Sequence, residues 1–112
     1  MAGKFLVSKS KDGQTFFVLK AANGQTILQG ERYKTPKSCA NGIESVRKNS
    51  QEDKRFECKK AKDGRTYFVL KAANGQPIGK SQMYKTESGC ANGIDSVRRN
   101  APDAAVAEAA GD

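Results

Sequence analysis

The stretch Phe17-Val18-Leu19-Lys20-Ala21-Ala22-Asn23-Gly24-Gln25 occurs a second time, without a single change, as residues 68–76. A shift of 51 residues aligns the two copies, and 28 of the 47 positions from Lys4 to Ser50 recur at positions 55–101. Self-similarity of this extent indicates a duplicated unit, and repeated units bury a continuous core between neighbours. The sequence therefore predicts two tandem copies of one structural unit.

The repeated stretch is typical of a strand followed by a tight hairpin turn. Aromatic and β-branched residues over Thr15–Ala21 favour a strand, and Asn23-Gly24 favours a turn because glycine adopts positive φ without strain. A third strand is expected over Gln25–Gln29 and a first over Lys4–Lys9, which a turn at Asp12-Gly13 joins to the second. Alternation then points one set of side chains inward. In the first copy this set is Phe5, Val7, Phe17, Leu19, Ala21 and Ile27.

Each copy is expected to continue into a helix. Thr35 and Thr86 suit the N-cap, and Pro36 suits the first helical position. The core-facing stripe consists of Cys39, Gly42, Ile43, Val46 and Ser50, and of Cys90, Gly93, Ile94 and Val97 in the second copy. Glycine inside a helix costs about 1 kcal/mol relative to alanine. Gly42 and Gly93 therefore indicate a close approach of the helix backbone to the sheet or to the other helix; backbone packed against a ligand is the alternative.

The two copies are expected to fold together. About fifty residues bury too little surface for a stable domain. We predict an α+β fold in which two tandem β-β-β-α(-β) repeats form one pseudo-twofold domain with an antiparallel sheet and two helices. This single domain spans residues 1–101, with repeat one at 1–50 and repeat two at 51–101. The acidic, alanine-rich tail at 102–112 either frays or adds a short edge strand around Ala105-Val106.

The composition gives a strongly basic body. Lys and Arg total 20 against 12 Asp and Glu, a formal net charge of +8. Three of the acids, Asp103, Glu108 and Asp112, lie in the tail, so residues 1–101 carry 20 − 9 = +11. Such an excess attracts polyanions and also keeps a small protein in solution. The chain has no apolar run of membrane-spanning length and no signal-peptide pattern at its start, so the cytoplasm is the expected location.

The sequence indicates neither catalysis nor a cofactor. It contains no histidine, which excludes Ser-His and Cys-His nucleophiles. Cys39, Cys58 and Cys90 form no CxxC pair, so neither a zinc site nor a disulfide framework is expected. All three are expected to be small buried apolar residues, with Cys58 alternating inward with Phe56; a reactive thiolate is the alternative.

The outward face of the second strand of each copy has the character of a binding surface. Two triplets share this face: Phe16, Val18 and Lys20, and Tyr67, Val69 and Lys71. Rings beside cationic side chains are what single-strand nucleic-acid binders use. Burial of this face as core or interface against the partner repeat is the interpretation that we favour. The candidate polyanion contacts are Lys37, Lys48, Lys59, Lys60, Lys62, Arg65, Arg98, Arg99 and Tyr67. For the basic residues among them a solvated surface is the interpretation that we favour, and a specific nucleic-acid site is the alternative.

The duplicated pattern resembles the YegP-like family of bacterial proteins. The resemblance lies in the Asp12-Gly13 turn, the stretch at 17–25, and Cys39-Ala40-Asn41-Gly42-Ile43 with their counterparts, and it covers roughly residues 3–106. It implies a β-β-β-α-β repeat in which tandem members imitate a dimer within one chain. It also implies that each repeat gives its final strand, around Arg55–Cys58 and around Ala105–Glu108, to the other. The family has no established activity and supplies no catalytic residues.

Two functional hypotheses remain. The first is a small non-catalytic binding or interaction module, monomeric with an internal pseudo-dimer, whose partner is nucleic acid or an acidic protein and not a membrane. The second is a structural or stress-associated protein that acts through self-assembly.

Overall fold

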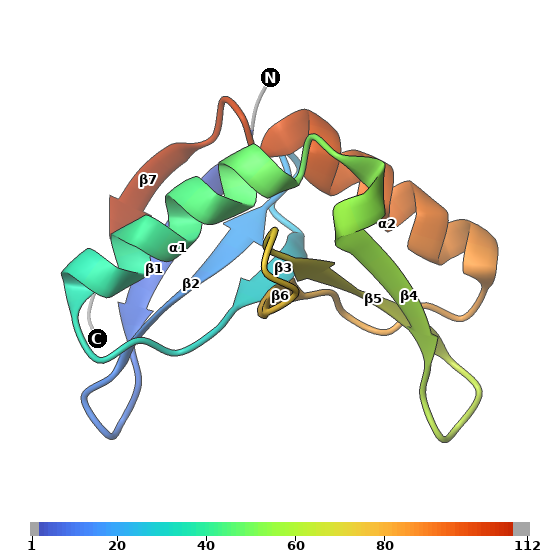
Figure 1. The fold of residues 1–112 in the computed structure, drawn as a ribbon, viewed down its shortest axis with the longest axis horizontal. Coiled ribbons are helices and arrows are strands. Elements are labelled where there is room, and N and C mark those ends of the chain that lie inside the picture. The colour runs from blue at the N-terminus through green and yellow to red at the C-terminus, as the bar shows by residue number, and fades with distance from the viewer. Residues whose placement is uncertain (1–2, 109–112) are drawn as a thin grey trace.

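The computed structural model describes residues 3–108 as a seven-stranded sheet bent into an arch, with two helices on its upper side (Figure 1). The first repeat contributes β1 (Lys4–Lys9), β2 (Thr15–Lys20), β3 (Thr26–Gly30) and α1 (Pro36–Asn49). A short 3-10 helix, η1 (Asp53–Arg55), leads into β4 (Phe56–Lys60), β5 (Thr66–Lys71), β6 (Pro77–Lys80), α2 (Glu87–Asn100) and β7 (Ala105–Glu108). Neither helix is long and apolar enough to cross a membrane. Tail residues 109–112 lie outside the described residues.

The two repeats lie side by side in one sheet, in the strand order β4-β5-β6-β3-β2-β1-β7. The central strands β3 and β6 pair antiparallel through Gln29 with Lys80 and Gly30 with Gly79, and a pseudo-twofold axis passes between them. The predicted α+β fold of two repeats is thereby confirmed. The sheet is mixed rather than wholly antiparallel, because β7 pairs with β1 in parallel.

The helices form as the sequence predicts. Thr35 accepts a hydrogen bond from the amide of Ser38 at 3.1 Å, and Thr86 accepts one from Gly89 at 3.0 Å. Each helix packs over strands of both repeats, since α1 contacts β2, β5 and β6 while α2 contacts β5 and β3. The core therefore runs continuously beneath both helices. Its fully buried members include Phe5, Phe17, Leu19, Cys39, Val46, Phe68, Leu70, Cys90 and Val97.

The inward glycines of the helices face tyrosine rings. A side chain at Gly42 would overlap the Tyr33 ring, and one at Gly93 would overlap the Tyr84 ring, with Cβ only 2.7 Å from Cζ. These tyrosines lie between the third strand and the helix of each repeat, and each stacks on the core phenylalanine of the second strand. The predicted close approach is confirmed, but the neighbour is a ring from the preceding loop rather than the sheet or the other helix.

Leu28 belongs to the core although strict alternation from Ile27 would point it outward. The pairing of β2 with β3 shifts register between Leu19 and Lys20, so that Leu19 pairs with Leu28 and Lys20 with Thr26. This bulge buries Ile27 and Leu28 together. The same shift occurs in the second repeat between Leu70 and Lys71, where Gly79 takes the place of Leu28.

The expected burial of Cys58 is wrong. Its neighbour Phe56 is only half-buried, and Cys58 itself is exposed, because β4 is the edge strand at its end of the described sheet. The equivalent residue in the first repeat, Val7, is half-buried on β1, whose edge is covered by β7. The strand exchange that the resemblance implied is therefore one-sided: Ala105–Glu108 joins β1, whereas residues 55–58 lead into and begin β4.

The interpretation that the outer face is covered by the partner repeat is also wrong. Both helices lie on the inner face, and the second repeat extends the sheet sideways instead of stacking on it (Figure 1). Within residues 3–108 no element packs on the outer face. The strand alternation thus presents Phe16 and Tyr67 on an open surface, where both rings are half-buried.

Candidate functional site

The outer face of the sheet carries one row of residues that crosses all seven strands. The register places them side by side in the order Glu57, Val69, Lys80, Gln29, Val18, Leu6 and Ala107. Lys80 and Gln29 occupy its centre, on the pseudo-twofold axis. Figure 1 shows the β1–β2 and β4–β5 hairpin loops projecting downward on either side of this face, which makes the face concave.

Tyr67 forms the aromatic centre of the second repeat's half of this face. The ammonium of Lys80 lies 4.8 Å from the centroid of the Tyr67 ring, a cation–π contact between β6 and β5. Lys59 pairs across β4 and β5 with Tyr67, and Lys71 lies four residues farther along β5 on the same face. A hollow of about 300 Å³ opens over these side chains, floored by the buried Val69 and reached from the first repeat by Glu31.

Glu57 partly neutralises this half of the face. It pairs with Lys71 and lies 4.0 Å from the ammonium of Lys59. The hydrogen bond from Lys71 and the charges of Lys71 and Lys59 hold the pKa of Glu57 below its usual value. Lys80 makes no ion pair with the side chains of residues 3–107, so the charge over the Tyr67 ring is the least compensated of the three.

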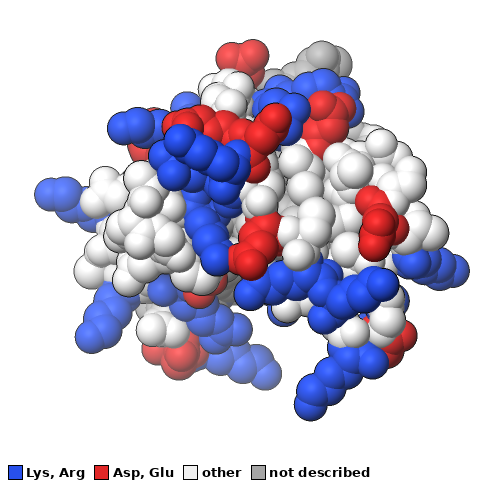
Figure 2. Space-filling view, turned by 45° about the vertical axis from the view of Figure 1, so that its right-hand side comes forward, with Lys and Arg blue, Asp and Glu red and all other residues white. Residues whose placement is uncertain are grey.

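The first repeat presents a second aromatic ring among basic side chains. Phe16 lines a hollow of about 520 Å³ together with Lys9, Lys11, Asp12 and Arg32. Asp12 accepts hydrogen bonds from Ser10 and from the Gln14 amide, which lower its pKa and hold the turn in shape. Figure 2 shows Lys and Arg side chains projecting on both sides of the recess at the bottom of the molecule, between the two hairpin loops.

The structure divides the predicted contacts between the two sides of the molecule. Lys59 and Tyr67 lie on the outer face, and Lys62 and Arg65 belong to the adjoining β4–β5 hairpin, where Arg65 pairs with Asp63 at 2.8 Å. Lys60 pairs with the buried Thr66 and so alternates to the inner side of β4. Four contacts lie on the helices, which cover the opposite face: Lys37, Lys48, Arg98 and Arg99.

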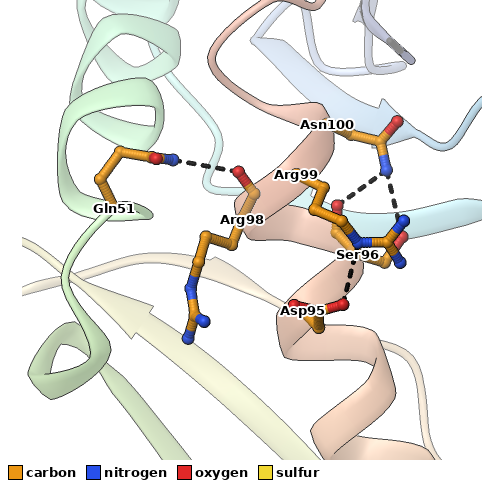
Figure 3. Close-up of polar contacts among 6 residues, drawn as sticks. All are labelled: Gln51, Asp95, Ser96, Arg98, Arg99 and Asn100. Carbon is orange, nitrogen blue, oxygen red and sulfur yellow. Dashed lines mark hydrogen bonds and ion pairs between the residues drawn. The ribbon is translucent and has the colours of Figure 1, made fainter. Parts of the chain in front are cut away.

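The two helix arginines have structural partners. Figure 3 shows their guanidinium groups pointing to different sides of α2. Arg99 pairs with Asp95 at 2.9 Å, in the favourable i,i+4 order. Arg98 pairs with Asp53, and its backbone carbonyl accepts a hydrogen bond from Gln51 at 3.1 Å, which ties the linker between the repeats to α2 (Figure 3). These contacts favour a structural role for this pair.

The candidate contacts omitted Lys80 and Arg32. A signal for Lys80 was present in the repeat itself. Two outer positions differ between the copies and are basic only in the second: Ser8 corresponds to Lys59, and Gln29 corresponds to Lys80. The second copy thus has two charges around its ring that the first copy lacks. No group of three or more His, Cys, Asp or Glu within residues 3–108 could hold a metal ion.

Comparison with known proteins finds relatives along the whole repeat pair. The sequence model of the domain of unknown function DUF1508 matches twice, at residues 10–57 and 61–108. A UPF0339 protein of Pseudomonas aeruginosa is 51% identical over 108 residues, covering 96% of this chain and 98% of the relative. The UPF0339 protein YegP of Escherichia coli K12 is 54% identical over 100 residues, covering 89% of this chain and 91% of the relative.

Two solved structures have the same fold. The solution NMR structure of yegP from E. coli, described as a protein of unknown function, superimposes with a TM-score of 0.91 at 51% identity, covering 96% of this chain and 93% of that one. The solution NMR structure of a UPF0339 protein from Shewanella oneidensis gives a TM-score of 0.90 at 44% identity, covering 96% and 92%. The names of these proteins assign no ligand or activity.

Proposed function

Because this chain belongs to the DUF1508 family, for which no function is described, we propose from its surface chemistry that it is a non-catalytic module that binds single-stranded nucleic acid on the outer face of the sheet. One observation supports this most directly. Lys80 lies 4.8 Å above the Tyr67 ring on an open, concave face that also carries Lys59 and Lys71. Base stacking on aromatic rings within a cationic groove is the common mode of single-strand binding.

The chemistry of the face favours single strands over duplexes. Every base has a stacking surface, and unpaired bases can reach a ring within a recess while their phosphates meet the surrounding lysines. Phe16 in the first repeat supplies a second ring beside Lys9, Lys11 and Arg32. The lysines act as point charges on flexible stems, and such contacts follow the phosphate backbone without distinguishing bases. Binding should therefore have little sequence preference.

Fluorescence anisotropy with labelled oligonucleotides tests the proposal. Single and double strands of equal length are titrated with the protein at low and at near-physiological salt. Single strands should bind more tightly, and their affinity should fall steeply with salt because bound lysines release counterions. Tyr67→Leu removes the ring but keeps an apolar side chain, and it should weaken single-strand binding by about 1–3 kcal/mol.

A matched pair of charge variants separates the sheet face from the helix face. Lys80→Gln introduces the residue that the first repeat carries at Gln29, and Arg99→Gln removes the same charge from α2. Lys80→Gln should weaken binding several-fold and reduce the slope of the salt dependence, while Arg99→Gln should change little. Equal loss in both variants would point to binding by net charge alone. No binding at low salt would exclude nucleic acid and make an acidic protein the better partner.

Self-assembly is the second candidate, and the edge of β4, which pairs with no second strand of the described sheet, favours it. An unpaired strand edge can template pairing with another chain, although Lys59 and Lys60 on this strand oppose such pairing by their charge. Light scattering over a range of protein concentrations distinguishes the two candidates. Stable association in the absence of any polyanion would favour assembly, and a monomer that binds single strands would favour the binding module.

A further inference from the structure

Cys58 and Cys90 bring two thiols together across the two layers of the second repeat. Cys58 lies on the edge strand β4, and Cys90 lies in α2 on the inner side of the sheet. Their sulfur atoms are 3.6 Å apart although the residues are 32 positions apart in sequence. A disulfide has an S–S distance of about 2.0 Å, so closing the bond requires the sulfurs to move about 1.5 Å toward each other.

One thiol of this pair is accessible and the other is not. Cys58 is exposed, whereas Cys90 is completely buried. A hollow of about 400 Å³ opens directly over Cys58, and Lys59, Lys60 and Glu87 line it as well. Lys60 lies on the same side of β4 as Cys58, and the two lysines that line this hollow outnumber its one acid, Glu87, so the hollow attracts small anionic reagents. The edge position of β4 leaves the approach to this sulfur unobstructed by any other strand of the described sheet.

The first repeat lacks this arrangement. Cys39 occupies the position equivalent to Cys90 and is equally buried, but Val7 stands where the second repeat has Cys58. The strand β7 also covers β1, so Val7 does not lie at an open edge. Each repeat therefore has a buried thiol, but only the second has an exposed thiol beside it. Cys39 in the first repeat thus serves as a control for the reactivity of Cys90.

We propose that Cys58 and Cys90 form a reversible intramolecular disulfide when the protein meets a small, anionic disulfide oxidant such as glutathione disulfide. The Cys58 thiolate attacks one sulfur of the oxidant, which forms a mixed disulfide and releases one small thiol. The Cys90 sulfur then attacks the Cys58 sulfur and displaces the second small thiol, which takes up the Cys90 proton. The two cysteines lose two electrons and two protons, and the oxidant gains them as two thiols.

The order of attack follows from burial. Desolvation, followed by the contact with Cys58, raises the pKa of Cys90 to about 12, so its thiolate is scarce at neutral pH. The exposed sulfur therefore reacts first and the buried one resolves the mixed disulfide. The sulfur pair lies on the opposite side of the sheet from the Tyr67 ring, and Lys59 is the one residue that lines both this hollow and the hollow over Tyr67.

Thiol trapping on the full chain tests the proposal. The protein is equilibrated with glutathione disulfide, unfolded in an alkylating reagent, and analysed by intact mass and peptide mapping. Of the three free thiols of the reduced chain, only Cys39 should remain alkylatable, and a peptide pair linked through Cys58 and Cys90 should appear and vanish on reduction. Cys39→Ala should leave this cross-link unchanged.

Cys58→Val places the first repeat's residue in the second repeat and should abolish the cross-link while Cys90 stays free. Circular dichroism of this variant, compared with the wild type, checks that the fold is retained. Three other results would overturn the proposal: glutathione retained on Cys58 with Cys90 still free, a dimer linked through two copies of Cys58, or three free thiols after equilibration in excess oxidant. None of these readouts depends on nucleic-acid binding.

Discussion

Leu28 occupies the space that a side chain at Gly79 would need. An ideal Cβ at Gly79 would lie 2.7 Å from Cδ2 of Leu28, closer than carbon atoms approach in proteins. The two residues are equivalent under the shift of 51 positions and lie beside the pseudo-twofold axis. The centre of the inner face therefore has room for one leucine, which the first repeat supplies, and the equivalent position of the second repeat is a glycine.

This relationship predicts a compensating pair of substitutions. Gly79→Leu should destabilise the protein by about 1–3 kcal/mol through overpacking. Leu28→Gly should cost about 2–5 kcal/mol because it leaves a cavity. The double exchange, which moves the leucine to the other repeat, should be more stable than the less stable single variant. Urea unfolding measures all four proteins. A double variant that loses the sum of both single effects would show that the two positions are independent.

The helix glycines give a second prediction. Gly93→Ala should lower the free energy of unfolding, because overlap with the Tyr84 ring costs about 1–3 kcal/mol and outweighs a helix-propensity gain of about 1 kcal/mol. Gly89→Ala on the same helix is the matched control, since its Cβ would meet no atom closer than 3.4 Å. It should stabilise the protein or leave it unchanged. Equal gains in both variants would contradict the close approach at Gly93.

A third prediction concerns the attachment of β7. Arg47 donates a hydrogen bond to the carbonyl of Ala104 at 2.6 Å, and its guanidinium lies 5.5 Å from the centroid of the Phe5 ring. Arg47→Ala should weaken the docking of β7 by about 1.5–3 kcal/mol. Hydrogen exchange of amides 105–107 should become correspondingly faster. Arg98→Ala, at the equivalent position, removes a contact to Asp53 instead and should leave those amides unchanged.

The proposed binding surface gives a fourth prediction, through Glu57. Glu57→Gln frees Lys71 and Lys59, so single-strand affinity should rise about 2- to 5-fold at neutral pH. Because the pKa of Glu57 is lowered in the folded protein, its pairing is present at neutral pH and is lost only as the pH falls through that lowered value. The advantage of the variant should disappear on acidification in the same range. Glu44→Gln on α1 makes the same charge change and should not raise affinity, and a rise in both variants would indicate net charge alone.

Signals contained within one repeat allowed the sequence to predict most of the elements. The first strand runs over Lys4–Lys9 as expected, and the Thr35 cap and the buried stripe from Cys39 to Val46 follow from local residue chemistry. The third strand is shifted by one residue, to Thr26–Gly30, because of the bulge opposite Lys20. Strict alternation contains no information about such a bulge.

The failures concern how the repeats are placed relative to each other. The two repeats join where β3 pairs with β6, through Gln29 and Gly30 of β3. Neither residue type indicates in the sequence that this strand pairs with another. Without that register, the sequence cannot reveal that the outer face is open or that β4 is an edge strand. Cys58 is exposed because β4 is an edge strand. Arg98 and Arg99 lie far from Tyr67 because the helices cover the inner face and Tyr67 lies on the outer face. Lys80 joins the Tyr67 surface only because β6 is a neighbour of β5.

The pairing of β7 with β1 also determines how the chain carries force. The two strands run parallel through four residue pairs, from Lys4 with Ala105 to Val7 with Glu108. A pull applied at Lys4 and Glu108 acts along both strands in opposite directions, so it loads these pairs in shear and not one after another. The backbone hydrogen bonds of all four pairs must break together before β1 and β7 can separate from each other. Forced unfolding is governed by the height of such a barrier and not by equilibrium stability. Under a force applied at these two residues, the four-residue strand β7 therefore sets the mechanical resistance of the fold.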